Sequence, residues 1–350
     1  MGSEGSDERV IAGRYRLQAA LGRGGMGVVW RATDELLGRQ VAVKELVPDD
    51  SPSAARVRSS RDRTLREARA LAQLRHPHIS VVHDVVEHDE RLYIVMELID
   101  GGSLADRIAA HGPVDVREAA RIGIALLGAL RAAHEDGVLH RDLKPANVLI
   151  ESGTGRVVLT DFGVAQVEGA TTLTESGTFV GSPEYTAPER MSGSGTGPAS
   201  DLWSLGVLLC TAVSGESPFH RDSLGGLLHA VVAAPIRPPA QVGPLLPVVL
   251  GLLERDPERR LDAAQAERML GEFLETGRTP EPTRPQRIPR DRLVIALLVA
   301  AMVAAGVSAA ALFMNGGAGE GGGTPVSPTP STSLSTSASP SADASNSPPK

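Results

Sequence analysis

The feature that most limits how this chain can fold is a change of composition late in the sequence. Earlier, apolar residues recur with helix and strand periodicity between turn residues, as in a packed domain. Residues 277–292 are then rich in proline and arginine, residues 293–313 carry neither charge nor proline, and residues 314–350 are mostly Gly, Ser, Thr, Pro and Ala. A folded domain is therefore expected over residues 14–276, after a flexible N-terminus at 1–13.

The apolar segment 293–313 predicts a transmembrane helix. As a helix it would rise about 31 Å, which matches a hydrocarbon core of about 30 Å. A buried core helix is the alternative, but only Ser308 interrupts the apolar run. The arginine-rich linker before it predicts, by the positive-inside rule, a single-pass protein of the cell membrane with residues 1–292 cytoplasmic. The polar tail at 314–350 is expected to be extracellular and disordered.

Composition narrows the remaining classes. The net charge of −7 argues against a general nucleic-acid binder. Cys210 is the only cysteine, so no internal disulfide can form, and its apolar surroundings predict a small core residue. With only 3% aromatic residues, the core must be built from Leu, Val, Ala and Ile.

Periodicity predicts strands in the first part of the domain and helices in the second. A small sheet-rich lobe before a larger helical lobe indicates an α+β, bilobal fold with a cleft between the lobes. The expected strands are residues 14–21, 28–33, 40–47, 91–98 and 156–160. The expected helices are residues 64–75, 116–135, 199–214, 224–233, 247–254 and 263–274.

The glycine cluster at residues 21–29, LGRGGMGVV, fits the pattern GxGxxGxV. Glycine lets a backbone approach a phosphate closely. An ordinary hairpin turn is one alternative, and a dinucleotide-binding βαβ unit is another, but there the glycines would open a helix. Here the apolar run at 28–30 follows at once and predicts a strand. The pattern therefore favours a hairpin that covers a nucleotide.

The stretch VLHRDLKPANVLI, residues 138–150, places five polar or charged side chains between apolar residues. Buried polar groups are costly unless they are partnered, so a simple turn would not need them. Asp161 ends another apolar strand and precedes Phe162 and Gly163, which alone would indicate a turn. Together with Asn147 it offers the oxygen ligands that Mg²⁺ prefers. Lys44, at the end of VAVK, would by itself be a solvated strand lysine.

Six motifs in order carry a family resemblance: GxGxxGxV, VAVK, HRDLKPAN, DFG, APE and DLWSLG. Over roughly residues 15–275 the chain resembles the eukaryotic-type Ser/Thr protein kinases. With the predicted membrane span, it is similar to the single-pass, receptor-like Ser/Thr kinases of bacteria. The resemblance implies phosphoryl transfer from ATP to protein Ser and Thr hydroxyls.

The resemblance also assigns roles to the polar stretch. Asp142 would accept or orient the proton of the substrate hydroxyl, and Lys144 would neutralise the γ-phosphate. Asn147 and Asp161 would bind Mg²⁺, with Mn²⁺ as an alternative. Lys144, two residues after Asp142, is typical of the Ser/Thr branch, whereas His140 is expected to be structural.

An ATP site is implied along the cleft. Lys44 would contact the α- and β-phosphates and would be braced by an ion pair with Glu67. The adenine would lie among apolar side chains, hydrogen-bond the backbone near residues 97 and 98, and face Met96 as the gate to a back pocket. The residues implied at this site are Leu21, Gly22, Arg23, Gly24, Gly25, Met26, Gly27, Val28, Val29, Ala42, Lys44, Glu67, Met96, Glu97, Leu98 and Leu149.

The segment between DFG and APE predicts control by phosphorylation. Thr174, Ser176 and Thr178 are the preferred sites, and their phosphates would pair with Arg141. A homodimer would allow the chains to modify each other. Two departures stand out: Ser103 aligns where relatives place an acid near the ribose, and Ser182 replaces a common Thr. A pseudokinase would usually lack Lys44, Asp142 or Asp161. A small-molecule phosphotransferase would not need the APE segment, whose Glu189 is expected to pair with Arg260.

Overall fold

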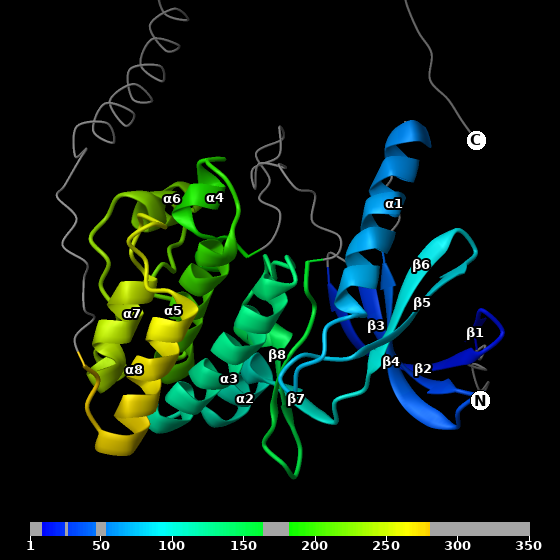
Figure 1. The fold of residues 1–350 in the computed structure, drawn as a ribbon, viewed down its shortest axis with the longest axis horizontal. Helices are drawn as coiled ribbons and strands as arrows, with labels where there is room; N and C mark the ends of the chain where they lie inside the picture. Colours follow the sequence, from blue (N-terminus) through cyan, green and yellow to red (C-terminus); the bar gives the residue numbers. More distant parts are fainter. Residues whose placement is uncertain (1–8, 25–26, 47–53, 164–181, 281–350) are drawn as a thin grey trace, which may run out of the picture. The chain divides into compact units, whose positions relative to one another are not determined.

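The computed structural model describes residues 9–24, 27–46, 54–163 and 182–280, with backbone only for 54–60 (Figure 1). Several predicted features lie outside these ranges. No helix among the described residues combines the length and the apolar character that a membrane crossing requires. The features outside the described residues are Gly25, Met26, Thr174, Ser176, Thr178, the linker from residue 281, the predicted span 293–313 and the tail 314–350.

The first part of the domain is built on a six-stranded antiparallel sheet. The strand order is β1-β2-β3-β4-β6-β5. Four of these strands were predicted from the sequence, the one at residues 91–98 from its alternation, while β1 and β5 were not predicted. The strands are β1 (Val10–Ile11), β2 (Tyr15–Gly24), β3 (Gly27–Asp34), β4 (Arg39–Leu46), β5 (Val82–His88) and β6 (Arg91–Glu97).

The glycine cluster forms the end of the β2–β3 hairpin, as the sequence predicted. Gly24 lies opposite Gly27, and β3 begins directly at Gly27 rather than a helix. Gly27 has a φ of +134°, and a Cβ there would lie 1.9 Å from the backbone oxygen of Glu45 on β4. Only glycine allows this close approach of strand to strand.

Helix α1 (Ala54–Leu71) is the one long helix of the first part, and Figure 1 shows it beside the sheet. Its apolar face includes Ala68 and Leu71, both buried in the larger hydrophobic core. The helix begins earlier and ends earlier than the predicted range 64–75. Its first ten residues hold few apolar side chains, so periodicity alone could not reveal them.

The second part is mainly helical and carries a small sheet in the order β7-β8-β9. All the helices predicted beyond residue 115 are present, whereas α2, which begins after the N-cap Ser103, was not predicted. The strands are β7 (Gly101–Ser103), β8 (Val148–Glu151) and β9 (Val157–Leu159). The α-helices are α2 (Leu104–His111), α3 (Val116–Glu135), α4 (Pro188–Met191), α5 (Pro198–Ser214), α6 (Leu224–Val232), α7 (Leu246–Leu252) and α8 (Ala263–Thr276), and the 3₁₀ turns are η1 (Pro145–Asn147), η2 (Pro183–Tyr185) and η3 (Ala240–Leu245).

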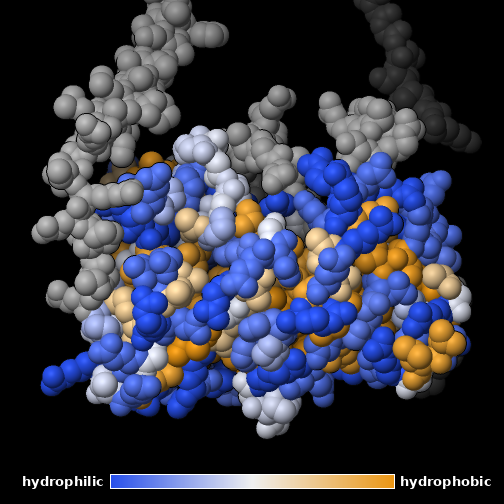
Figure 2. Space-filling view, in the orientation of Figure 1, coloured by the Kyte–Doolittle hydropathy of each residue, from blue (hydrophilic) through white to orange (hydrophobic). Residues whose placement is uncertain are grey.

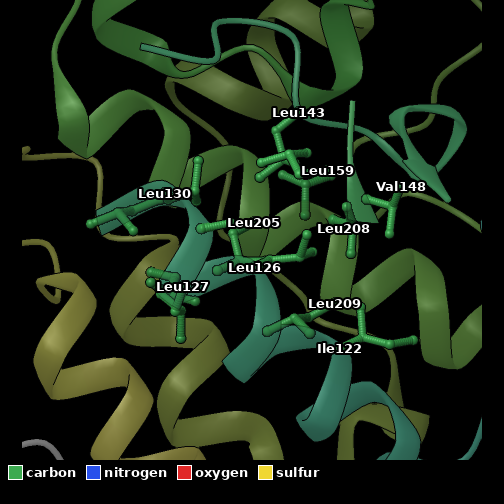
Figure 3. Close-up of a cluster of buried hydrophobic side chains, with 14 of the residues drawn as sticks. Ile122, Leu126, Leu127, Leu130, Leu143, Val148, Leu159, Leu205, Leu208 and Leu209 are labelled. Carbon is green, nitrogen blue, oxygen red and sulfur yellow. The ribbon is translucent and has the colours of Figure 1, made fainter. Parts of the chain in front are cut away.

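The core of this part is aliphatic, as the low aromatic content predicted. Figure 3 shows side chains of α3 and α5 packed together with Leu143, Val148 and Leu159. Leu143 lies within the polar stretch, Val148 follows its last polar residue, and Leu159 lies on β9, so buried side chains anchor the stretch to this core. Cys210 is fully buried on α5, and burial raises the pKa of its thiol to about 12. On the face drawn in Figure 2, hydrophilic residues cover most of the described surface.

Candidate active site

The stretch between α3 and β8 gathers a carboxylate, an ammonium and an amide. Asp142 is 9% exposed, and Lys144 Nζ donates to its Oδ2 at 2.7 Å. The same Nζ donates to Ser182 Oγ at 3.2 Å. Asn147 donates its side-chain amide to the backbone oxygen of Asp142 at 2.7 Å and to Oδ2 at 3.2 Å. The residues predicted for catalysis therefore meet around one carboxylate, beside a hydroxyl from another segment.

The His140 ring anchors this loop from within. It is fully buried and packs against Phe162, with ring centroids 4.7 Å apart. Its Nε2 lies 2.9 Å from the backbone oxygen of Thr160, and the backbone N–H of Asp142 donates to its Nδ1 at 3.3 Å. Burial lowers the pKa of His140, so the neutral ring fits both bonds. This supports the structural role predicted for His140.

Asp201 on α5 binds the backbone of the same loop through its carboxylate. Its carboxylate accepts the backbone N–H of His140 at 2.9 Å and of Arg141 at 2.8 Å, and it pairs with His134 Nε2 at 2.8 Å. Burial opposes its ionisation, but His134 and the backbone N–H groups hold its pKa below the ordinary value. Arg141 needs this support because its φ is +66°, a conformation that side chains other than glycine rarely adopt.

The two residues predicted as metal ligands lie beside neighbouring strands: Asn147 ends η1 directly before β8, and Asp161 follows β9 by two residues. The N–H of Thr160 donates to the backbone oxygen of Asn147 at 3.0 Å, which places Asp161 next to the end of the loop. The amide nitrogen of Asn147 is committed to Asp142, so its amide oxygen is the atom that can coordinate a cation. One carboxylate and one amide oxygen fit Mg²⁺ when phosphates supply further ligands. Among the described residues no cluster of three or more acidic, His or Cys side chains could hold a metal alone.

The predicted ion pair between Lys44 and Glu67 is wrong for this structure. Lys44 on β4 lies with Nζ 2.8 Å from Asp161 Oδ1, and Glu67 on α1 lies with Oε1 3.1 Å from Arg141 Nη1. Both acids thus pair with a cation, but the partners differ from those expected. The position of α1 relative to Arg141 decides which cation Glu67 can reach. This position depends on tertiary packing, so it could not be predicted from the sequence.

The residues predicted around the adenine come from four strands. Leu21, Val29 and Ala42 lie on β2, β3 and β4, and Leu149 lies on β8. Gly22, Arg23 and Gly24 pair across the hairpin with Val29, Val28 and Gly27. Ala42 lies opposite Met96, and Glu97 ends β6 directly before Leu98.

Met96 lines a small cavity, and its predicted role as a gate stays a prediction. The cavity has a volume of about 30 Å³ and is lined by Lys44, Ile94, Met96, Thr160 and Asp161, among others. Thr160 Oγ1 donates to Met96 Sδ at 3.9 Å.

Comparison with known proteins decides the family. The family described as protein kinase domain matches residues 15–269. The chain belongs to the protein kinase family. It is 40% identical over 242 residues to Serine/threonine-protein kinase PknA of Mycobacterium tuberculosis, covering 68% of this chain and 54% of that protein. It is 34% identical over 260 residues to Serine/threonine-protein kinase PrkC of Bacillus subtilis, covering 73% and 39%.

A solved kinase structure shares the fold. The crystal structure of Rad53 1-466 in complex with AMP-PNP matches with a TM-score of 0.62 and 29% identity, covering 73% of this chain and 64% of that one. The match spans about half or less of the length of these two bacterial relatives. The mixed α/β architecture of this chain is therefore a protein kinase fold.

The kinase segment beyond Ser182 is anchored as expected. Arg260, fully buried in its side chain, donates to Glu189 Oε1 at 2.7 Å and to Oε2 at 2.9 Å. Ser200 Oγ donates to the same Oε1 at 2.8 Å. Despite desolvation by burial, Arg260 and Ser200 lower the pKa of Glu189. The predicted Glu189–Arg260 pair is confirmed.

Three supporting residues of this kinase were missed from sequence. Asp201 stands inside the recognised motif DLWSLG, but its bonds to the loop could be assigned only with the fold in hand. Arg190 donates to the backbone oxygen of Arg141, and it follows directly after the APE motif. Arg156 has no signal of its own in the sequence, although it makes ion pairs to two acids.

Proposed function

We propose that this chain is an ATP-dependent Ser/Thr protein kinase that transfers the γ-phosphoryl group of ATP to Ser and Thr hydroxyls of proteins. The observation that carries the proposal is the cluster of Asp142, Lys144 and Ser182, with Asn147 and Asp161 adjoining it. Both bacterial relatives bear the name Ser/Thr-protein kinase, and the Rad53 structure holds AMP-PNP. These similarities support the same reaction class here.

The chain's own residues suit phosphoryl transfer, which depends mainly on positioning and charge neutralisation. Asp142 would accept the proton of an incoming hydroxyl, because its carboxylate is the acceptor at the centre of the cluster. Lys144 would place a positive charge at the transferred group. A Mg²⁺ ion held by Asp161 and Asn147 would neutralise phosphate charge when bound.

The test is transfer of labelled phosphate from ATP to a generic protein acceptor by the purified full chain. Asp142→Asn keeps the shape of the side chain but removes its charge, so transfer should slow by roughly 10²- to 10⁴-fold. Asp136→Asn is the matched control, since Asp136 is exposed at the end of α3 and should leave the rate unchanged. A wild type no faster than Asp142→Asn would contradict the proposal. Labelling of small acceptors alone would favour a small-molecule phosphotransferase.

The proposal extends to control and place in the cell. We propose autophosphorylation between the DFG and APE motifs, within a homodimer, and a single membrane span at residues 293–313. The hydroxyl-rich segment and the apolar segment of the sequence support these two extensions. Signalling by a membrane-anchored bacterial kinase would follow, with protein substrates on the same side as the kinase domain.

A further inference from the structure

Arg156 contacts two residues that are far from it in the sequence and one residue of its own hairpin. It stands in the turn between β8 and β9, and its side chain is 27% exposed. Its Nη2 lies 2.6 Å from Glu97 Oε1 and 3.0 Å from Glu151 Oε1, and its Nε lies 3.2 Å from Glu151 Oε2. Its Nη1 donates to the backbone oxygen of Pro77 at 3.1 Å. The hydrogen bonds to Glu151 and Glu97 raise the pKa of this guanidinium further, so its charge is permanent.

Glu97 connects Arg156 to the segment that is assigned to adenine binding. It ends β6, and its backbone N–H donates to Val81 O at 2.8 Å. Its two carboxylate oxygens serve two partners: Oε1 faces Arg156, and Oε2 accepts the N–H of Val81 at 3.4 Å. The side chain is therefore engaged within the protein, while the backbone of residues 97 and 98 is the segment assigned to adenine.

The other end of the network is the β8–β9 hairpin, to which Arg156 itself belongs. Glu151 ends β8, the strand that carries Leu149, and Leu149 is the residue assigned to the floor under the adenine. Arg156 thus joins the strand that bears the adenine-binding backbone to the hairpin that bears the floor. A guanidinium with two carboxylates and a carbonyl in fixed geometry is more than a surface ion pair, because its bonds are charge-assisted and half-buried.

We propose that Arg156 and Glu97 form a clamp that positions the ATP site, with Arg156 as a positioning residue rather than a catalytic one. The proposal rests on the proposed kinase function and names a determinant of its ATP affinity. Loosening the clamp lets the backbone at residues 97 and 98 move relative to Leu149. The affinity for ATP then falls, whereas Asp142 and Lys144 keep their geometry.

The test compares two variants that cut the clamp with one that spares it. Arg156→Gln and Glu97→Gln remove the link between β6 and the hairpin. Glu151→Gln is the matched control, because it weakens a contact of Arg156 inside its own hairpin and leaves the link to Glu97. We expect the KM for ATP to rise about three- to tenfold in the two clamp variants, with kcat within about twofold of the wild type. The control should stay within about twofold in both constants.

Two further variants distinguish a positioning role of Arg156 from a general loss of stability. The double variant Arg156→Gln with Glu97→Gln should be no worse than either single variant, since both remove one shared interaction. Arg156→Lys should recover part of the ATP affinity, because an ammonium keeps the charge but cannot reach all three partners. Additive effects in the double variant, or an equal effect of Glu151→Gln, would overturn the clamp.

Amide hydrogen exchange of the nucleotide-free chain tests the clamp without activity. The amides of Val81 and Glu97 should exchange faster in the clamp variants and at the wild-type rate in Glu151→Gln. Unchanged exchange together with unchanged KM would overturn the proposal, and so would a rise in kcat with unchanged KM. A wild type that neither binds nor uses ATP would instead overturn the proposed function, and the exchange data would still decide whether the clamp exists.

Discussion

Ser80 is a buried hydroxyl without a hydrogen-bond partner in the described part of the chain. It is 9% exposed and lines the cavity of about 30 Å³ beside Met96. A buried polar group that lacks a partner keeps the cost of its desolvation. We expect Ser80→Ala to raise the free energy of unfolding by about 1 kcal/mol. Urea unfolding monitored by fluorescence or circular dichroism measures this change.

Ser204 on α5 differs from Ser80, because its hydroxyl has hydrogen-bond partners. Its hydroxyl is also buried, but it donates to Tyr185 O at 2.7 Å and to Ser200 O at 3.1 Å. Ser204→Ala should therefore lower the free energy of unfolding by about 1 kcal/mol. If both substitutions destabilise equally, Ser80 has a partner such as a bound water in the cavity, and the prediction for Ser80 is wrong.

At the scale of elements, α1 contacts the candidate site through an ion pair. Glu67 on this helix contacts Arg141, while Lys44 contacts Asp161. Between α1 and the loop lies a cavity of about 500 Å³, lined by Arg63, Glu67 and Arg141 among others. The cavity gives the helix room to shift. Such a shift would let Glu67 exchange Arg141 for Lys44 as its ion-pair partner. In protein kinases the lysine of the VAVK strand must pair with the helix glutamate for activity, so under the proposed function we expect such a shift to activate this chain.

Phosphorylation between DFG and APE is the expected trigger of this shift. A phosphate carries about −1.5 to −2 charges and would compete with Glu67 for Arg141, so we expect Glu67 to exchange Arg141 for Lys44. The triple variant Thr174→Ala, Ser176→Ala and Thr178→Ala should lose at least about fivefold in activity. Mass spectrometry after incubation with ATP should find phosphate at these residues, and Thr171→Ala with Thr172→Ala is the control. Full activity of the triple variant would refute this mechanism.

The elements themselves were predictable where periodicity was strong. The strands that became β3 and β4 contain the short apolar runs VVW and VAV, and α3 has both a capping Asp115 and an apolar face. The segment that became β5 is broken by His83 and Asp84, and the start of α1 is almost entirely polar. Those elements depend on tertiary packing rather than on local pattern, so reading the sequence could not find them.

At the scale of the whole molecule, the order of motifs predicted the site better than any single residue did. Asp142, Lys144 and Asn147 lie on one loop, so their meeting follows from local sequence. The contacts that cross the domain do not: Glu67 with Arg141, and Glu97 with Arg156, join residues 74 and 59 positions apart. Such pairs depend on how the two parts of the domain sit against each other, and several arginines compete for each acid.

The last prediction concerns how the chain is placed at a membrane. Residues 293–313 are uncharged, and five arginines between residues 278 and 292 precede them. The positive-inside rule therefore predicts that the kinase domain lies in the cytoplasm and the tail outside. The test uses Ser341→Cys in a Cys210→Ala background, probed in intact cells with a membrane-impermeant thiol reagent. Labelling is expected at position 341 and absent in the control variant Ser3→Cys. The reverse pattern would overturn the orientation, and recovery of the full chain in the soluble fraction would overturn the span itself.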